Sequence, residues 1–323
     1  MLENTEKIEK AEGQSLCNLP DLQNQADIRG IALDRVGITN VYFPIAVERK
    51  DFLNSPLPAS ARVKLFVHLP QEYKGANLSR FMQCLVAYEN QVIDINSMTK
   101  LLDELMLKLS SKDAYARFEF DFYMDVKSPV TDNRAPQRYR CAFIGQHENG
   151  NYNFIIEANV VAASVCPCSR GMSLLEQLEY GDIKWNVPAN DDYYSKLTKQ
   201  IFIDASNVEL SQQVGMGAHN QRSNIRVRLI AKPGEMIWLE DLIQLIEAQA
   251  SAPVYPILKR PDEKFVTEQG YKNAKFSEDI ARDVFSALQN HEKIESWAVR
   301  VYNEESIHAF DVSSYVKSDN WKF

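Results

Sequence analysis

The sequence predicts an α+β protein built from two related modules. In each half of the 323-residue chain, runs rich in β-branched and aromatic residues flank a pair of helical patterns. Strands interrupted by paired helices are typical of antiparallel sheets covered by helices. Because this order occurs twice, the second module is expected to repeat the first. An apolar fraction of 45% is enough for a sizeable core.

The first half contains five predicted strands and two predicted helices. Apolar and polar residues partly alternate in the strands, which lie at 37–47, 62–70, 116–126, 138–143 and 152–165. The helices lie at 78–89 and 98–109, and in the second of them apolar residues form a single stripe. Residues 148–151, Glu-Asn-Gly-Asn, are expected to form the turn of the last hairpin.

The second half repeats this order. In 221–232, apolar residues alternate with arginines and other polar residues, which predicts a half-buried strand with a basic face. Helices are predicted at 237–250 and 277–289, with Ser277 as the N-cap of the second. Strands at 294–302 and 306–312 close the chain.

The predicted organisation has four parts. Residues 1–26 are a polar flexible tail, 27–170 are the first module and 217–323 are the second. The acidic segment 171–216 separates the modules as an insertion. It can be a lid, a subunit contact or a tolerated surface segment.

Composition limits the possible partners. A net charge of −8 argues against nucleic-acid binding, although local cations can still hold an anionic substrate. No run reaches the roughly 18 apolar residues of a membrane span and no signal peptide is evident, so a cytoplasmic location is expected. Five cysteines, an odd number, favour reduced thiols or metal ligands over a disulfide framework.

Several segments carry side chains from which catalytic metal sites are built. Cys-Pro-Cys at 166–168, Gly-Ala-His-Asn-Gln-Arg-Ser at 217–223 and a stretch with Glu305 and His308 supply thiolates, imidazoles and carboxylates. Structural roles are equally open at this point. Buried cysteines behave as small apolar residues, and a carboxylate such as Glu278 is favoured in the first turn of any helix.

The chain resembles the type IB GTP cyclohydrolases, a prokaryotic family that makes dihydroneopterin triphosphate from GTP. The resemblance runs from about residue 27 to the end of the second module, and several strings occur in the family's order. They are 27–31 with 36–37, 74–75 with 79–81, 166–169, 217–223, 253–255, 259–264, 266–268, and 278–279 with 282–283.

This resemblance implies the tunnelling fold, in which ββααββ modules pair and oligomerise around a central tunnel. It implies a homo-oligomer, expected to be a tetramer, with active sites between subunits. One divalent metal ion, Zn, Mn or Fe(II), is expected in each site, with no organic cofactor. The metal ligands match Cys166, His219 and Glu263.

The resemblance also assigns the catalytic steps. Water activated by the metal attacks C8 of GTP, the imidazole ring opens and formate leaves. Cys168, Glu305 and His308 match positions suited to acid–base work, and Glu278 matches the carboxylate that anchors guanine. The cations expected to hold the triphosphate are Arg222, Lys259 and Arg260. Whether the product feeds folate, another pterin or a modified tRNA base stays open.

One departure leaves alternatives. In most of the family the Cys-Pro-Cys-Ser string is followed after a short link by Gly-Ala-His-Asn-Gln-Arg, whereas here 171–216 intervenes. A longer surface loop costs little closure entropy, so the two strings can still meet. The alternatives are a nitrile reductase of the same fold, with a nucleophilic cysteine and a nicotinamide cofactor, and an inactive metal-binding assembly protein.

Overall fold

A computed structural model describes residue 23 and residues 25–50, 55–179 and 217–323, with only the backbone for 174–179. Within this part of the chain, nine strands form one sheet in which all paired strands are antiparallel. The order is β1-β2-β3-β4-β5-β6-β8-β9, and β7 pairs with β5. The strands are β1 (Leu33–Val47), β2 (Leu57–Leu69), β3 (Ala114–Lys127), β4 (Arg134–Glu148), β5 (Asn151–Val165), β6 (Asn220–Ala231), β7 (Ala252–Pro253), β8 (Ile294–Glu304) and β9 (Val312–Lys317).

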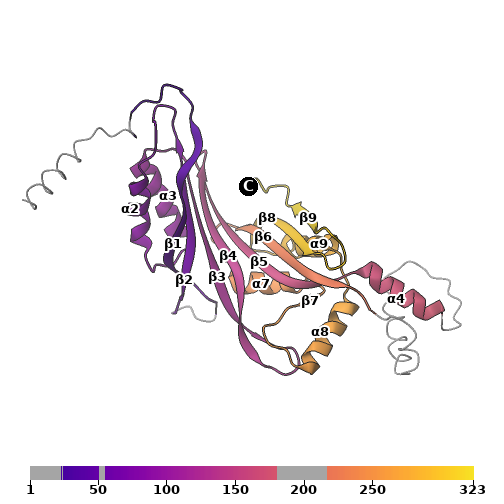
Figure 1. The fold of residues 1–323 in the computed structure, drawn as a ribbon. Coiled ribbons are helices and arrows are strands. Elements are labelled where there is room, and N and C mark those ends of the chain that lie inside the picture. The colour runs from indigo at the N-terminus through magenta and orange to yellow at the C-terminus, as the bar shows by residue number, and fades with distance from the viewer. Residues whose placement is uncertain (1–22, 24, 51–54, 180–216) are drawn as a thin grey trace, which may run out of the picture.

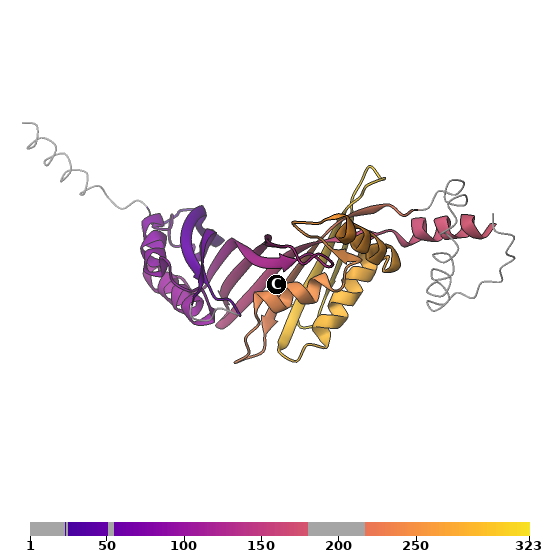
Figure 2. The same cartoon turned by 90° about the horizontal axis from the view of Figure 1, so that it is seen from below.

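Two helix pairs cover one face of this sheet. The first pair lies beside β1 and β2 and the second farther along the sheet, which twists between them (Figures 1 and 2). Apolar residues of both pairs belong to one core cluster with the inward side chains of the strands. The paired helices are α2 (Leu78–Leu85), extended by the 3-10 turn Val86–Tyr88, and α3 (Ile95–Leu109), then α7 (Leu239–Glu247) and α9 (Ser277–Gln289).

The element order confirms the prediction of two tandem ββααββ modules. It reads β1-β2-α2-α3-β3-β4 and then β5-β6-α7-α9-β8-β9, with α4 (Pro167–Glu179), β7 and α8 (Arg260–Lys272) as additions to the second. This order groups β5 with the second module, whereas the predicted first module, 27–170, includes that strand. The boundaries at 170 and 217 stay a prediction. Most of the tail and residues 180–216 of the insertion lie outside the described residues. None of the helices in the described part of the chain is long and apolar enough to cross a membrane.

Two local predictions were wrong. The last strand is Val312–Lys317 and not 306–312, because Ile307 and Phe310 are 63% and 64% exposed and imitate a strand pattern without a buried face. Ser277 is the first residue of α9, and Phe276 occupies the N-cap position. The Ser277 hydroxyl instead pairs with that of Ser314 on β9, at 2.7 Å. Helix α8 was missed because its sequence is highly charged and only Asp262 and Gly270 are buried.

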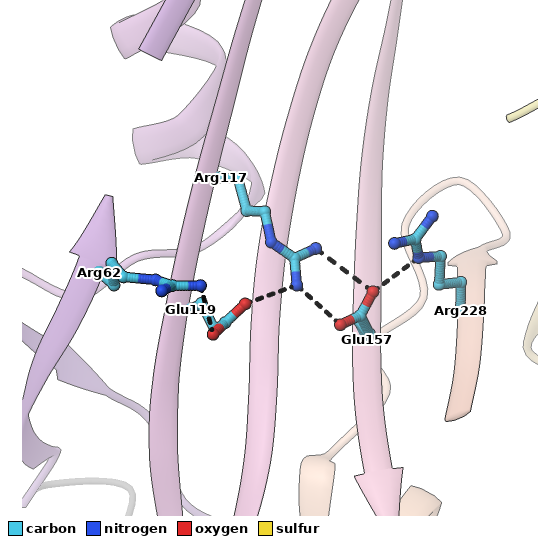
Figure 3. Close-up of polar contacts among 5 residues, drawn as sticks. All are labelled: Arg62, Arg117, Glu119, Glu157 and Arg228. Atoms are coloured by element: carbon cyan, nitrogen blue, oxygen red, sulfur yellow. Dashed lines mark hydrogen bonds and ion pairs between the residues drawn. The ribbon is translucent and has the colours of Figure 1, made fainter. Parts of the chain in front are cut away.

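The opposite face of the sheet carries a charged network across four strands (Figure 3). Glu157 on β5 accepts from both Arg117 on β3 and Arg228 on β6, with shortest distances of 2.8 and 2.6 Å. Arg117 also bonds Glu119 at 3.0 Å, and Arg62 on β2 reaches Glu119 at 3.3 Å. The intervening strand β4 places Ala142 opposite both glutamates in the ladder, and this small side chain lets Arg117 pass over it.

Candidate functional site

The pairing of β5 with β6 places two predicted metal ligands side by side. The last pair of this ladder is Val165 with Asn220, so the residues that precede and follow it meet at one end of the sheet. The backbone N–H of Cys166 donates to the carbonyl oxygen of His219 at 3.0 Å. The N–H of His219 donates to Ser169 Oγ, also at 3.0 Å. The backbones of Cys166 and His219 are therefore held together although the acidic segment separates them in sequence.

The His219 ring lies at the centre of a group of polar side chains. Its Nδ1 is 3.0 Å from Gln221 Oε1 and 3.3 Å from Ser306 Oγ. Gln221 Nε2 donates to Glu305 Oε1 at 3.1 Å. The ring of His308 is 6.3 Å from that of His219, centroid to centroid, in an edge-on orientation. The structure thus brings His219 together with Glu305 and His308, although several helices and strands, from β6 to β8, separate them in the sequence.

The loop that carries Glu305 and His308 is closed by a residue that sequence reasoning missed. Asp311 Oδ1 accepts from the backbone N–H of Glu305 at 3.0 Å, and its other oxygen accepts from the Tyr302 hydroxyl. Within the loop, the His308 ring stacks on Phe310 at a centroid distance of 5.0 Å. Asp311 therefore joins the two ends of the loop, which limits the positions that Glu305 can take.

Cys168 lies in the first turn of α4 and is exposed, whereas Cys166 is half-buried. Figure 1 shows α4 projecting beyond the end of β5 and β6, so Cys168 belongs to the same end of the sheet. Both thiols are free of disulfides.

The remaining predicted residues lie at helix starts and on β6. Glu263 is exposed in the first turn of α8, after the exposed Lys259 and Arg260. Glu278 is exposed in the first turn of α9, where the Ser277 hydroxyl donates to its Oε2 at 2.9 Å. Arg222 is exposed and pairs across the ladder with Glu304. No group of three or more His, Cys, Asp or Glu residues in the described part of the chain is arranged to hold a metal ion.

The donor set of Cys166 and His219 nevertheless fits a divalent transition metal. A thiolate and an imidazole are ligands that Zn²⁺ and Fe(II) accept, and the backbones of the two residues are hydrogen-bonded at the end of the β5–β6 ladder. Among the described residues, His219 Nε2 has no hydrogen-bond partner, whereas Nδ1 faces Gln221. The chain therefore supplies two neighbouring ligands, and any third carboxylate ligand has to join them from elsewhere.

Asp262 anchors the helix that carries Glu263. Its carboxylate is fully buried and accepts from the N–H of Val130 and of Thr131, both at 2.9 Å, from the Thr131 hydroxyl at 2.5 Å and from Lys259 N–H at 2.9 Å. Burial alone favours the neutral acid, but these hydrogen bonds hold the pKa of Asp262 well below its usual range. The start of α8 is thereby tied to the loop between β3 and β4.

We expect Asp262→Asn to loosen this connection, because the NH₂ of the new amide would face groups that are themselves donors, the backbone N–H groups and the Thr131 hydroxyl. Amide exchange at Val130 and Thr131 should accelerate about tenfold or more, since hydrogen bonds to an ionised acceptor are the strong ones. Hydrogen exchange read by mass spectrometry checks this result. Asp279→Asn is the matched control, because Asp279 accepts from Phe276 N–H at 3.0 Å at the start of α9 and pairs with the exposed Arg282 at 3.5 Å. Unchanged exchange at Val130 in Asp262→Asn would contradict the assignment.

The fold and this site together define a class: an α+β protein of two ββααββ modules with a thiolate–imidazole pair at the strand ends. The sequence matches the family described as type I GTP cyclohydrolase folE2 over residues 19–314. The GTP cyclohydrolase FolE2 of Geobacter sulfurreducens is 33% identical over 304 residues, covering 94% of this chain and 100% of that protein. The chain belongs to the type I GTP cyclohydrolase FolE2 family.

Other similarities cover comparable lengths. The GTP cyclohydrolase FolE2 of Fervidobacterium nodosum is 34% identical over 301 residues, covering 93% of this chain and 98% of that protein. Among solved structures, the uricase from Arthrobacter globiformis aligns with 90% of this chain and 95% of its own, at 5% identity and a TM-score of 0.45.

Proposed function

We propose that this protein is a type IB GTP cyclohydrolase, which converts GTP to 7,8-dihydroneopterin triphosphate with release of formate. The observation that carries the proposal is the contact of Cys166 with His219, beside Gln221, Glu305 and His308, in a chain of the FolE2 family. A nitrile reductase has no use for His219 as a metal ligand, and a bare scaffold needs no Glu278, Glu305 and His308.

Cys166, His219 and Glu263 are the proposed metal ligands. A divalent ion held by them would supply an activated water for attack on C8 of guanine, which begins ring opening. The acid–base work falls to His308, Glu305 and Cys168, whose side chains can donate or accept protons as the ring opens and the ribose rearranges. The loop closed by Asp311 holds Glu305 and so restricts where such a proton can be delivered.

Glu278 is the proposed guanine anchor. Its carboxylate can accept from both N1–H and the exocyclic amine of guanine, which adenine cannot match. Glu278 lies in the first turn of α9, where the Ser277 hydroxyl donates to its Oε2 and so orients it. Arg222, Lys259 and Arg260, all exposed, are the proposed partners of the triphosphate.

The active site is proposed to form between subunits of a homotetramer. Within the described residues of one chain, Glu263 does not join Cys166 and His219 in a metal-binding group. A copy of Glu263 from a second subunit would supply the missing carboxylate. Zn, Mn and Fe(II) all suit the set, no organic cofactor is proposed, and a cytoplasmic location stays a prediction.

GTP turnover by metal-stripped protein tests the proposal. With Mn²⁺ or Zn²⁺ added back, we expect formate and a fluorescent oxidised neopterin, and no product without metal. Folded protein that binds metal but yields no product with any divalent ion would reject the cyclohydrolase and favour the inactive assembly protein. Turnover of a nitrile with oxidation of a nicotinamide cofactor, independent of metal, would instead support the reductase.

A further inference from the structure

We infer that Gln221 is a positioning residue: held by Glu305, it keeps the His219 imidazole in the tautomer with hydrogen on Nδ1 and leaves Nε2 as the metal-binding nitrogen. The inference deepens the proposed function and rests on its metal site. It assigns a role to a neutral amide that carries neither a charge nor a metal-ligand signature in the sequence.

The direction of the hydrogen bonds follows from what each group can donate. An ionised carboxylate only accepts hydrogen bonds, so the side-chain NH₂ of Gln221 must face Glu305, where the Nε2–Oε1 distance is 3.1 Å. The carbonyl oxygen of the same amide then faces His219 Nδ1, at 3.0 Å. Since this oxygen only accepts, Nδ1 must carry the hydrogen.

The other contacts of His219 agree with this assignment. Ser306 Oγ, 3.3 Å from Nδ1, can accept from the same N–H because its hydroxyl hydrogen is free to rotate away. The backbone on either side is held by Cys166 and Ser169. Both the attachment point of the ring and its rotation are therefore restrained before any metal arrives.

The spacing of the two residues explains how they meet. Positions two apart on an extended chain point to the same side, so Gln221, the second residue of β6, lies beside the His219 ring. In the neutral ring with hydrogen on Nδ1, the lone pair is on Nε2, which has no hydrogen-bond partner among the described residues. Metal-binding histidines are commonly held in this way by an acceptor on the other nitrogen.

Gln221→Leu removes the acceptor with little change of size. In metal-free protein at about pH 8, nitrogen-15 spectra should show the His219 hydrogen on Nδ1 in the unchanged protein and a mixed or Nε2–H population in the variant. Its Zn²⁺ affinity, measured by competition with a chromophoric chelator, should fall about 10- to 100-fold. The His219 signals are assigned by their loss in His219→Ala.

Gln146→Leu is the matched control. Gln146 is also a strand glutamine that donates to a glutamate, Glu148, at 2.8 Å, but it lies on β4. We expect its Zn²⁺ affinity and the His219 tautomer to match those of the unchanged protein. A Gln221→Leu protein with unchanged Zn²⁺ affinity and an unchanged His219 tautomer would overturn the inference. A His219 ring with its hydrogen on Nε2 in the unchanged protein would also overturn it, and that measurement does not depend on the folding of any variant.

Neither measurement uses GTP, so the two proposals fail separately. An Nδ1–H ring and weakened Zn²⁺ binding in Gln221→Leu, together with no GTP turnover in the unchanged protein, would support the inference and reject the cyclohydrolase. Gln221→Asn, which retains the amide on a shorter side chain, should recover part of the affinity if the acceptor oxygen is what matters.

Discussion

Cys166→Ala is expected to abolish both Zn²⁺ binding and GTP turnover. Loss of a residue that only supports a metal ligand lowers affinity about 10- to 100-fold, so removing the thiolate itself should cost more than about 100-fold. The alanine keeps the backbone N–H that donates to His219, so the end of the sheet should stay intact. Metal content by atomic spectroscopy and formate release measure the two losses.

Cys84→Ala is the control for this result. Cys84 is a fully buried residue of α2, and burial raises the pKa of its thiol to about 11, so it is not available as a thiolate. The variant should bind the same amount of metal and turn over GTP, with some loss of stability from the deleted sulfur. If Cys166→Ala kept its metal and its turnover, the ligand assignment would be wrong.

Glu157→Ala is expected to lower the free energy of unfolding by about 3–5 kcal/mol. The side chains of Glu157 and Arg117 are only 6% and 11% exposed, and Arg228 also bonds Glu157 (Figure 3). Removing the carboxylate leaves the Arg117 guanidinium with Glu119 alone in a largely buried place. Denaturant unfolding, followed by tryptophan fluorescence, measures the loss.

Asp241→Ala is the matched control, because it removes an ion pair that is exposed. Asp241 and Lys50 are 2.6 Å apart but 44% and 48% exposed, so the loss should stay below about 1 kcal/mol. A Glu157→Ala loss as small as this would mean that Arg117 finds water or another partner when Glu157 is gone.

The same network gives a direction for the pH dependence of stability. Burial alone would raise the pKa of Glu157, but the hydrogen bonds and charges of Arg117 and Arg228 outweigh it and lower the pKa below the usual glutamate value. A lowered folded-state pKa contributes stability above the unfolded-state value, about 4.3, and this contribution is lost as the pH falls through the folded-state value. Glu157→Gln should therefore lose less stability than the unchanged protein on acidification below about pH 4.

Periodicity alone predicted the regular elements well. In β6, the alternation in 221–232 required apolar side chains on one face, and Ile225, Val227 and Leu229 are fully buried there. In α3, the apolar stripe packs into the core through Met98 and Leu105. These predictions succeeded because burial of one face imposes a period that the sequence records directly.

The predictions failed where an element is held by contacts with distant residues and not by an apolar face of its own. Helix α8 has little apolar face and is held at its start by Asp262, whose partners Val130 and Thr131 are distant in sequence. The loop after β8 has exposed apolar residues and is closed by Asp311. The Asp262 hydrogen bonds and the loop closure by Asp311 leave no periodic pattern in the sequence. Neither could therefore be predicted from the sequence alone.

By itself, the sequence determined the α+β class, the ββααββ order, and, through its motifs, the family and the residue types of the site. Only the tertiary structure decided which of those residues meet: the β5–β6 ladder joins Cys166 to His219, and Gln221 connects that imidazole to Glu305. The reason is physical. Periodicity and composition report which side chains avoid water, whereas contacts between neighbouring polar groups depend on strand register and loop closure between distant segments.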